Sequence, residues 1–496
     1  MDLIVLVKYV ADVDNIPEDA WDTERGTLRR NRLQMVANPL DDRALQLALA
    51  IREHGKAIVL SMGPPQAEEI CRRAIAHGAD GAVLLSDGAF SGADTIATAR
   101  TIVGAIEKMI HQGLVRDPLV LAGMQSPDGD TAQVPIQVAA LLQFPLIPYV
   151  AAWRMKGSAL AFETLQPRGR SELILQRPPA LATVSKFIPD LPFFTSLERM
   201  GAAADAIVTR WNRQDLGLEE PLVGLAGSFT RVVQIFSPEK KGRAAYRLEF
   251  GGERDPLEAL PVVLGTLRDF LRAGGERESG ETQDAHGPSS GEPAYYEGEC
   301  AVLCERERTG PITGGSRELL GAATVLAETL GTRTTAIVPG EVSPEELDQL
   351  ARSGADHVVS IPAEYSGAFL PEEQAHAVTA LVRERRPQIL LVPATLTGRV
   401  VAPLIAAELG AGLTADCTGL QIADYVGRVG GRETVYGKVL HQTRPALGGN
   451  VMATIVSLRG RDNRSPQMAT ARPGVFSVLD REGAEATLEK FAYPAT

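Results

Sequence analysis

Short apolar runs alternate with longer amphipathic stretches along the first part of the chain. The runs are continuously apolar and rich in β-branched residues, as buried parallel strands are, and they lie at 3–7, 57–61, 81–85 and 119–122. The stretches with helical spacing lie between them, at about 41–54, 66–77 and 92–113. Asp41 and Asp94 stand near two of the expected helix starts, and Gly78 follows one expected end. This alternation predicts a doubly wound α/β sheet.

After residue 150 the pattern changes to short runs that predict strands added antiparallel to the sheet. These runs lie at 160–164, 171–175 and 180–184. We also expect a polar, hairpin-like excursion at 12–36, a strand at 230–236 and a last helix at 255–272. The stretch from Gly274 to Glu292 is rich in Gly, Ser and Glu and has no apolar period, which predicts a flexible linker.

Beyond the linker the first half of the chain recurs. Ala57-Ile-Val-Leu and Gly78-Ala-Asp80 are echoed by Ala336-Ile-Val-Pro and Gly354-Ala-Asp356, and the run at 119–122 is echoed at 389–393. Two copies of one unit predict a pseudo-twofold dimer made from one chain. The fold class we expect is α/β, with two tandem doubly wound parallel-sheet units packed as a pseudo-dimer. The expected boundaries are 1–272 and 298–476 for the units, 273–297 for the linker and 477–496 for a C-terminal tail.

Composition and charge limit the binding partners and the cellular compartment that we expect for the chain. The 496 residues carry a formal net charge of -12 and have a pI near 5.3, which disfavours nucleic acid and anionic membranes as main partners. The N-terminus is typical of a strand and not of a signal peptide, and no apolar run of about 18 residues could span a membrane. The 4 scattered cysteines cannot form a disulfide framework, which predicts a reducing, cytoplasmic location. Cys300 and Cys304 are expected to be core thiols and not metal ligands.

A polar loop follows the strand expected at 119–122. It opens at Gly123 and carries the hydroxyls of Ser126 and Thr131, and a helix is expected to start near Thr131 or Ala132. In an open parallel sheet, ligands bind outside the carboxyl ends of the strands, where a helix N-terminus offers N–H groups to an anion. The loop is therefore either a phosphate or nucleotide cradle or an ordinary turn with Asp130 or Thr131 as the N-cap.

The corresponding stretch of the second copy runs Thr395-Leu-Thr397-Gly398-Arg399. Composition alone makes it the better anion trap, because it places two hydroxyls, a glycine and an arginine at a helix start. The alternative is a capped helix whose Arg399 pairs with an acid of the other half. Arg444 and Arg472 each precede a proline and are expected at an interface or on the surface.

Several motifs of known chemistry are missing. There is no G-x-G-x-x-G after a strand and no Walker A sequence, so neither a Rossmann dinucleotide site nor a P-loop is supported. There is also no G-x-S-x-G, and no histidine is placed to serve a nucleophile. These features favour a binder of a nucleotide-like molecule whose chemistry is carried by a cofactor, and no catalytic residue is assigned.

Two sets of motifs resemble the electron-transfer flavoprotein family. Those that resemble the β subunit are Val5-Leu-Val-Lys8, Asn38-Pro-Leu-Asp41, Ser61-Met-Gly63-Pro64, Phe90-Ser-Gly92-Ala-Asp94 and Gln125-Ser-Pro-Asp128-Gly-Asp130-Thr-Ala-Gln133. Those that resemble the first domain of the α subunit are Gly412-Leu-Thr-Ala-Asp416-Cys417, Arg444-Pro-Ala-Leu-Gly448-Gly449-Asn450 and Pro466-Gln-Met-Ala-Thr-Ala-Arg472-Pro-Gly-Val475. The resemblance covers most of the chain and implies two adenine-nucleotide-hydrolase-like units, fused in the order β then α.

The resemblance implies that the β-like half holds an adenine nucleotide. This is AMP in the simple members of the family and a second FAD in the bifurcating members, and the form of the loop from Asp128 to Val134 is more like the bifurcating group. The resemblance also selects the loop from Asp128 to Val134, and not the one at Thr395, as the nucleotide site. The implied cofactor-binding residues are Leu6, Asn38, Pro39, Leu40, Asp41, Met62, Gly123, Gln125, Ser126, Asp128, Gly129, Asp130, Thr131, Ala132, Gln133 and Val134.

The chain also departs from the family pattern. The family's α subunit continues into a second, FAD-binding domain, and the stretch after Val475 is too short for a domain. Val13 and Leu40 stand where many β subunits carry aromatic residues that face that flavin. We therefore expect the partner to be a flavin dehydrogenase or a separate FAD-domain subunit. The stretch 192–197 keeps part of the pattern of the dehydrogenase-docking loop.

Three functions remain open on this evidence. The first is an electron-transfer flavoprotein-like core that binds FAD or AMP and passes electrons between a dehydrogenase and an acceptor, as a carrier and not as a catalyst. The second is a non-redox, AMP-binding scaffold or regulator. The third is an adenine-nucleotide hydrolase or transferase, against which the absence of an S-G-G-x-D-S-type phosphate loop argues.

Overall fold

A computed structural model of the chain shows the architecture. It describes residues 1–22, 27–28, 32–52, 54–167, 169–190, 193, 195–238, 297–307, 310–361, 371–429, 432–458 and 465–493. The helix expected at 255–272 and nearly all of the expected linker lie outside these residues. The unit boundaries on either side of the linker therefore stay predictions.

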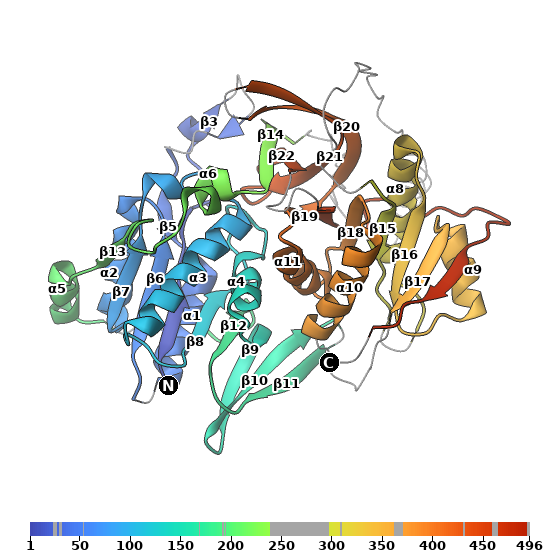
Figure 1. Cartoon of the computed structure of the whole chain (residues 1–496). Helices are drawn as coiled ribbons and strands as arrows, with labels where there is room; N and C mark the ends of the chain where they lie inside the picture. The colour runs from blue at the N-terminus through green and yellow to red at the C-terminus, as the bar shows by residue number, and fades with distance from the viewer. Residues whose placement is uncertain are drawn as a thin grey trace, which may run out of the picture. The chain divides into compact units, whose positions relative to one another are not determined.

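The first half is built on a nine-stranded sheet with the order β11-β10-β9-β12-β8-β1-β6-β7-β13 (Figure 1). Its strands are β1 (Leu3–Leu6), β6 (Ala57–Met62), β7 (Gly81–Leu85), β8 (Leu119–Gly123), β9 (Leu146–Lys156), β10 (Ala159–Gln166), β11 (Gly169–Leu175), β12 (Ala180–Val184) and β13 (Thr209–Trp211). The strands from β12 to β13 in this order run parallel to their neighbours, whereas β10 is antiparallel to both β9 and β11. The predicted doubly wound α/β sheet is confirmed.

Helices cover both faces of this sheet. They are α1 (Pro39–Ile51), α2 (Glu68–His77), α3 (Thr95–His111) and α4 (Val134–Leu142). Side chains alternate along a strand, so Leu3 and Val5 of β1 pack in the cluster that contains α1 and α2, whereas Ile4 and Leu6 pack with α3 and α4. Both faces of each central strand are therefore buried, which explains the continuous apolar runs in the sequence.

Most expected elements of the first half are confirmed within a few residues, and one expected pairing is wrong. Gly78 ends α2 with a φ of 117°, and the Asp94 side chain caps α3 by accepting from the N–H of Ala97 at 3.0 Å. Strand β12, expected to be antiparallel, runs parallel to both β8 and β9. All its residues are buried, as in a central parallel strand, but the chain reaches it only after the β10–β11 hairpin.

The second half repeats the same order with a seven-stranded sheet, β19-β23-β18-β15-β16-β17-β24. Its strands are β15 (Cys300–Leu303), β16 (Thr334–Pro339), β17 (His357–Ile361), β18 (Ile389–Pro393), β19 (Leu413–Cys417), β23 (Gln467–Ala471) and β24 (Thr487–Lys490), and its helices are α8 (Gly314–Leu330), α9 (Pro344–Arg352), α10 (Pro371–Arg385) and α11 (Gly398–Leu409). Position by position, this order matches β9-β12-β8-β1-β6-β7-β13 of the first half. The edge strand β24 lies in the stretch expected as a C-terminal tail.

The repeat extends to a backbone irregularity in each half. Tyr149 in β9 and Asp416 in β19 have φ values of 58° and 59°, in the left-handed region that such residues rarely adopt. Each donates its N–H to a threonine of the neighbouring strand, Thr183 of β12 and Thr470 of β23, at 2.9 Å in both cases. The equivalence of the two halves therefore holds at the level of single residues.

A strand of the first half joins a sheet of the second half. The four-stranded sheet β14-β22-β21-β20 contains β14 (Thr230–Phe236), β20 (Gly419–Val429), β21 (Arg432–Ala446) and β22 (Val451–Ser457). Strand β14 runs antiparallel to β22, with Thr230 opposite Ser457 and Phe236 opposite Met452. The backbone hydrogen bonds between β14 and β22 therefore connect the two halves.

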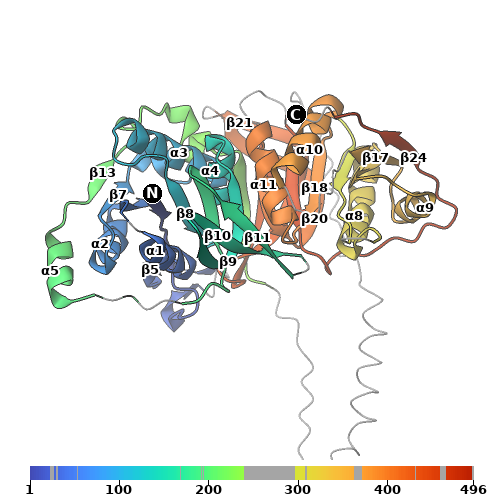
Figure 2. The same cartoon turned by 90° about the horizontal axis from the view of Figure 1, so that it is seen from below.

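The two halves also share a core. Helix α4 packs against α11, the helix that occupies the same place in the second half (Figure 2). One continuous apolar cluster includes Ile136 and Val138 of α4 together with Val400 and Leu404 of α11. Contact between equivalent helices confirms the predicted packing as a pseudo-dimer. In the part of the chain that the structure describes, no helix is long and apolar enough to cross a membrane.

Candidate functional site

The candidate site lies at the carboxyl ends of β1, β6 and β8, around the loop that joins β8 to α4. We name residues 124–133 the Asp128 loop. The predicted N-cap is wrong, because α4 begins at Val134 with Gln133 at the N-cap position and without a side-chain cap. Asp130 and Ala132 have φ values of 48° and 55°, which no helical residue adopts, so the loop continues past the expected helix start.

The buried carboxylate of Asp41 holds the base of the Asp128 loop. It accepts the N–H of Lys8 at 2.8 Å and that of Gly123 at 2.9 Å, which joins the ends of β1 and β8 to the start of α1. Burial raises the pKa of Asp41 to about 7, against these hydrogen bonds, which lower it. A Cβ on Gly123 would lie 2.6 Å from the Asp41 carboxylate and 2.7 Å from the Cβ of Leu40, so only glycine fits there. Asn38 adds a hydrogen bond of 3.0 Å to the carbonyl of Gln125.

Lys8 is a functional candidate that the sequence reasoning missed. Its ammonium group lies 2.8 Å from the Asp128 carboxylate, and the Ser126 hydroxyl donates to the same carboxylate at 2.7 Å. Burial raises the pKa of Asp128, but the charge and hydrogen bond of Lys8 outweigh burial and hold that pKa below its ordinary value. Lys8 directly follows β1 in a quoted motif, so its place at a strand end was the available signal.

The second half binds the carbonyl groups of the Asp128 loop. The buried guanidinium of Arg444 donates to the carbonyl of Gly129 at 2.7 Å and to that of Asp130 at 3.2 Å. The N–H groups of Leu447 and Gly448 donate to the carbonyls of Asp128 and Pro127, each at 3.1 Å. Arg444 is thus an interface residue, as expected.

Two N–H groups of the Asp128 loop differ from its carbonyl groups in their hydrogen bonding. Among the described residues, none accepts a hydrogen bond from the N–H of Thr131 or Ala132. Adjacent N–H groups in a loop that visits the left-handed region form a concave anion-binding nest. With its carbonyls fixed by the second half and the Lys8 ammonium beside it, the loop can hold a phosphate.

The remaining predicted residues take different places around this loop. Leu6 and Met62 lie at the ends of the neighbouring strands β1 and β6, whereas Pro39, Leu40 and Val134 open α1 and α4. The side chain of Gln133 is buried and accepts from the Thr95 hydroxyl at 2.7 Å while donating to the Leu413 carbonyl at 3.3 Å. These bonds engage both ends of that amide within the protein.

A cluster of charges adjoins the loop on the side of the second half. Burial keeps the pKa of Asp130 above its ordinary value, against the charges of Arg399 and Arg444. Asp416 pairs with Arg472, and its other oxygen lies 3.2 Å from Arg399. The ion pair of Arg399 is therefore with an acid of its own half, whereas the alternative drawn from the sequence placed it with an acid of the other half. Burial raises the pKa of Asp416, but Arg472 and Arg399 together hold that pKa below its ordinary value.

In the equivalent loop of the second half, the first hydroxyl is bound within that half. We name residues 394–397, between β18 and α11, the Thr395 loop. The Thr395 hydroxyl lies 2.7 and 2.9 Å from the two oxygens of Glu305 and accepts the N–H of Gly398 at 3.0 Å. Burial raises the pKa of Glu305 to about 7, despite these contacts. A Cβ on Gly398 would lie 1.8 Å from the Pro393 carbonyl, so the loop is closed around its own groups.

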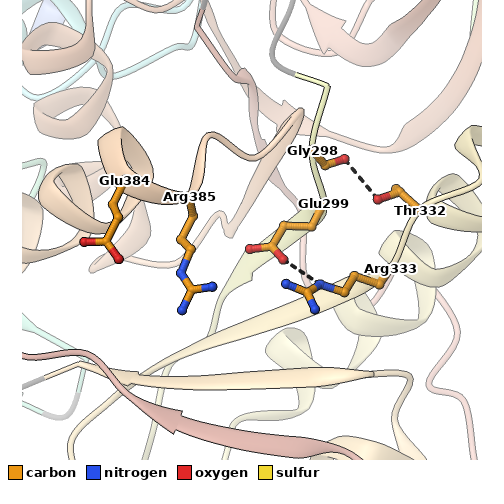
Figure 3. Close-up of a pocket in the computed structure, with 6 residues that line it drawn as sticks. All are labelled: Gly298, Glu299, Thr332, Arg333, Glu384 and Arg385. Atoms are coloured by element: carbon orange, nitrogen blue, oxygen red, sulfur yellow. Dashed lines mark hydrogen bonds and ion pairs between the residues drawn. The ribbon is translucent and has the colours of Figure 1, made fainter.

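A second hollow lies at the opposite, amino-terminal edge of the second sheet (Figure 3). Its lining residues are Gly298, Glu299, Thr332, Arg333, Glu384 and Arg385. Arg333 pairs with Glu299 at 2.9 Å, and the Thr332 hydroxyl donates to the Gly298 carbonyl at 3.1 Å. Acids and bases balance here, and ligands of such sheets bind at the other edge, so this hollow is not the cofactor candidate.

Comparison with known proteins assigns the family. The model of the electron transfer flavoprotein domain matches residues 25–215 and 300–496. The chain is 38% identical to the caffeyl-CoA reductase-Etf complex subunit CarD of Acetobacterium woodii over 275 residues, 55% of this chain and 98% of that protein. It is 36% identical over 271 residues to the electron transfer flavoprotein subunit beta of Clostridium acetobutylicum, covering 54% of this chain and 98% of that subunit.

The subunit alpha of the same organism matches the other part of the chain. That match is 40% identical over 193 residues, which is 38% of this chain and 53% of the α subunit. The order of the matches agrees with the two equivalent halves of the fold and with the motifs quoted from each half. The chain therefore belongs to the electron transfer flavoprotein family, with a β-subunit-like half and an α-subunit-like half in one polypeptide.

Proposed function

We propose that the chain binds an adenine nucleotide, FAD or AMP, at the Asp128 loop and takes part in electron transfer between a flavin dehydrogenase and an acceptor. The site comprises the sixteen residues predicted from the sequence, together with Lys8. The observation that carries this proposal is the set of unused N–H groups in a loop whose carbonyls are fixed from the second half.

The residues present fit the phosphate part of such a nucleotide. The Lys8 ammonium and the N–H groups of Thr131 and Ala132 supply a positive charge and donors, and Gly123 lets the loop start close to Asp41. A bound FAD would supply the redox chemistry, and the protein would supply binding, orientation and exclusion of water. FAD is the favoured occupant because the loop's sequence is more like the bifurcating members of the family.

The partner we propose is a flavin dehydrogenase or a separate FAD-domain subunit. One relative bears the name of a caffeyl-CoA reductase-Etf complex, and the match to the α subunit covers 53% of that protein. We assign the docking surface to α5 (Leu197–Asp205), which directly follows the stretch with part of the docking-loop pattern. The side chains of Leu197 and Met200 are 88% and 52% exposed there, and exposed apolar side chains of this size are typical of a protein contact.

The first test is a visible absorption spectrum of the purified chain, with mass spectrometry of what heat or acid releases. FAD in the supernatant, with bands near ~375 and ~450 nm before release, is expected for the redox proposal. Colourless protein that releases AMP would instead favour the non-redox, AMP-binding scaffold. Protein that holds neither nucleotide, even after incubation with each, would contradict the assignment of the Asp128 loop.

A further inference from the structure

Helix α5 is ordered without a core of its own. It has 9 residues, and Ala203 is the buried one among them. Isolated helices shorter than about 12 residues are marginal in water, so most helices of this length depend on tertiary packing. The order and the direction of α5 must therefore come from its polar contacts with α2.

Arg72 of α2 binds the carboxyl end of α5. Its Nη1 atom lies 3.0, 2.6 and 2.9 Å from the carbonyl oxygens of Ala203, Ala204 and Ala206. Ala203 also accepts the N–H of the C-cap residue Ala206 at 3.3 Å, and Ala206 itself directly follows the helix. The last carbonyls of a helix lack intrahelical donors, and the helix dipole favours a cation at this end. One guanidinium thus adds three hydrogen bonds and a positive charge to the C-terminal end of α5.

Two charged neighbours hold Arg72 in place. Its Nε and Nη2 atoms donate to one oxygen of Glu68 at 3.0 and 2.6 Å, while Nε of Arg210, in the edge strand β13, donates to the other oxygen at 2.9 Å. Hydrogen bonds from Arg210 and Arg72 lower the pKa of Glu68, so the carboxylate stays charged. We name Glu68, Arg72 and Arg210 the Arg72 clamp.

The other end of α5 is attached to the carboxyl end of α2. The hydroxyl of Thr195 donates to the Ala76 carbonyl at 2.8 Å, and the ring of Phe193 stacks on His77 with 4.0 Å between centroids. Ser196 then caps α5 by accepting the N–H of Arg199 at 3.2 Å. Both ends of α5 are fixed along α2, and Leu197 and Met200 are left facing solvent.

We propose that the Arg72 clamp sets the pose of α5 for docking, which makes Arg72 a positioning residue for the partner contact. This inference rests on the proposed function, in which α5 meets a flavin dehydrogenase. The clamp acts at the end of α5 far from Leu197, so it changes how the apolar side chains are presented without contributing to the contact itself. A core-packed helix would not depend on one side chain in this way.

Hydrogen exchange tests the structural half of the proposal. In Arg72→Ala, the amides of residues 200–205 should exchange about tenfold faster, and Arg72→Lys should recover part of the protection, because lysine keeps the charge but loses the planar set of donors. The matched control is Arg170→Ala, which breaks an arginine–glutamate pair on β11 and should leave α5 unchanged. Equal protection of α5 in wild type and Arg72→Ala overturns the proposal.

Binding to purified caffeyl-CoA reductase, measured by biolayer interferometry, tests the docking half. Arg72→Ala should raise Kd about fivefold, Arg72→Lys less, and Leu197→Ala at least as much, with Arg170→Ala matching wild type. A raised Kd in Leu197→Ala but not in Arg72→Ala overturns this inference and leaves the proposed docking surface intact. Unchanged Kd in both variants overturns the assignment of α5 as the docking surface.

Discussion

The Asp128 loop and the Thr395 loop occupy the same place in two copies of one fold, yet their polar groups have different partners. The Asp128 loop has its carbonyls bound by the other half and leaves N–H groups without an acceptor. The Thr395 loop directs its hydroxyl at Glu305 and its first helical N–H at that hydroxyl. The difference lies in which groups are bound: the other half binds carbonyls of the Asp128 loop, whereas an acid of the same half binds the first hydroxyl of the Thr395 loop.

One residue at equivalent positions inverts the charge of the two sites. The N–H of Val7 bonds to Leu60 as that of Cys304 bonds to Ile337, so Lys8 and Glu305 stand at the same point after the first strand of each half. An ammonium beside the Asp128 loop attracts a phosphate, whereas a buried carboxylate beside the Thr395 loop repels one. The second half also supports the first, because Arg444 and the N–H groups of Leu447 and Gly448 bind the carbonyls of the Asp128 loop.

Removing the Arg444 side chain, which supports the Asp128 loop, should have the largest effect on stability. Arg444→Ala leaves the carbonyls of Gly129 and Asp130 without these donors and removes a positive charge beside Asp130 and Asp416. We therefore expect a loss of about 3 kcal/mol in the free energy of unfolding. Urea denaturation measures it, and amide exchange in the Asp128 loop should accelerate. Arg170→Ala, on an exposed pair, should change neither quantity. A similar loss in both variants would show that Arg444 has no special role.

The close approach at the start of the Asp128 loop can be tested by adding one methyl group. Gly123→Ala places a Cβ 2.6 Å from the Asp41 carboxylate, so the loop or α1 must shift, at an expected cost of about 2 kcal/mol and with weaker nucleotide binding. Gly314→Ala, at the start of α8 and outside the proposed nucleotide site, is the control, since nothing lies within 4 Å of its added Cβ. Thermal unfolding with and without AMP measures both effects. Equal shifts in the two variants would rule out a tight packing role for Gly123.

The buried acid of the Thr395 loop predicts a pH dependence. The folded-state pKa of Glu305 is raised to about 7 from an ordinary 4.5, so its contribution to stability is present at low pH and is lost as pH rises from about 4.5 to 7. Glu305→Gln should therefore gain on the order of 2 kcal/mol over wild type at pH 8 and little at pH 4.5. Denaturant unfolding at the two pH values checks this. A difference that does not depend on pH would contradict it.

The positive charge of Lys8 should affect the affinity for a nucleotide more than the stability of the fold. Lys8→Gln should weaken AMP binding about tenfold, because a charged donor to phosphate becomes neutral. Isothermal titration of nucleotide-free protein measures the change, with Lys156→Gln, on a surface pair with Glu172, as the matched control. If both variants lose the same affinity, the effect is one of net charge and not of position.

Much of each half could be predicted from residue patterns. The apolar runs give the strands β1, β6, β7 and β8 almost to the residue, and Gly78 and Asp94 mark helix ends by their own backbone and side-chain chemistry. The repeat was visible because equivalent strands carry similar runs. The Asp128 loop was selected by its resemblance to the family, against the composition argument, which favoured the Thr395 loop.

The elements, their alternation and the two equivalent halves could be predicted from residue patterns, because these depend on local periodicity and on residues that act within a few positions. The parallel insertion of β12, the addition of β14 to the sheet of the second half and the left-handed course through Asp130 and Ala132 depend instead on tertiary packing. The contacts of Arg444 and Lys8 with the Asp128 loop likewise form only in the folded chain. These features join residues far apart in the chain, and whether a polar group finds a partner depends on every segment that packs around it.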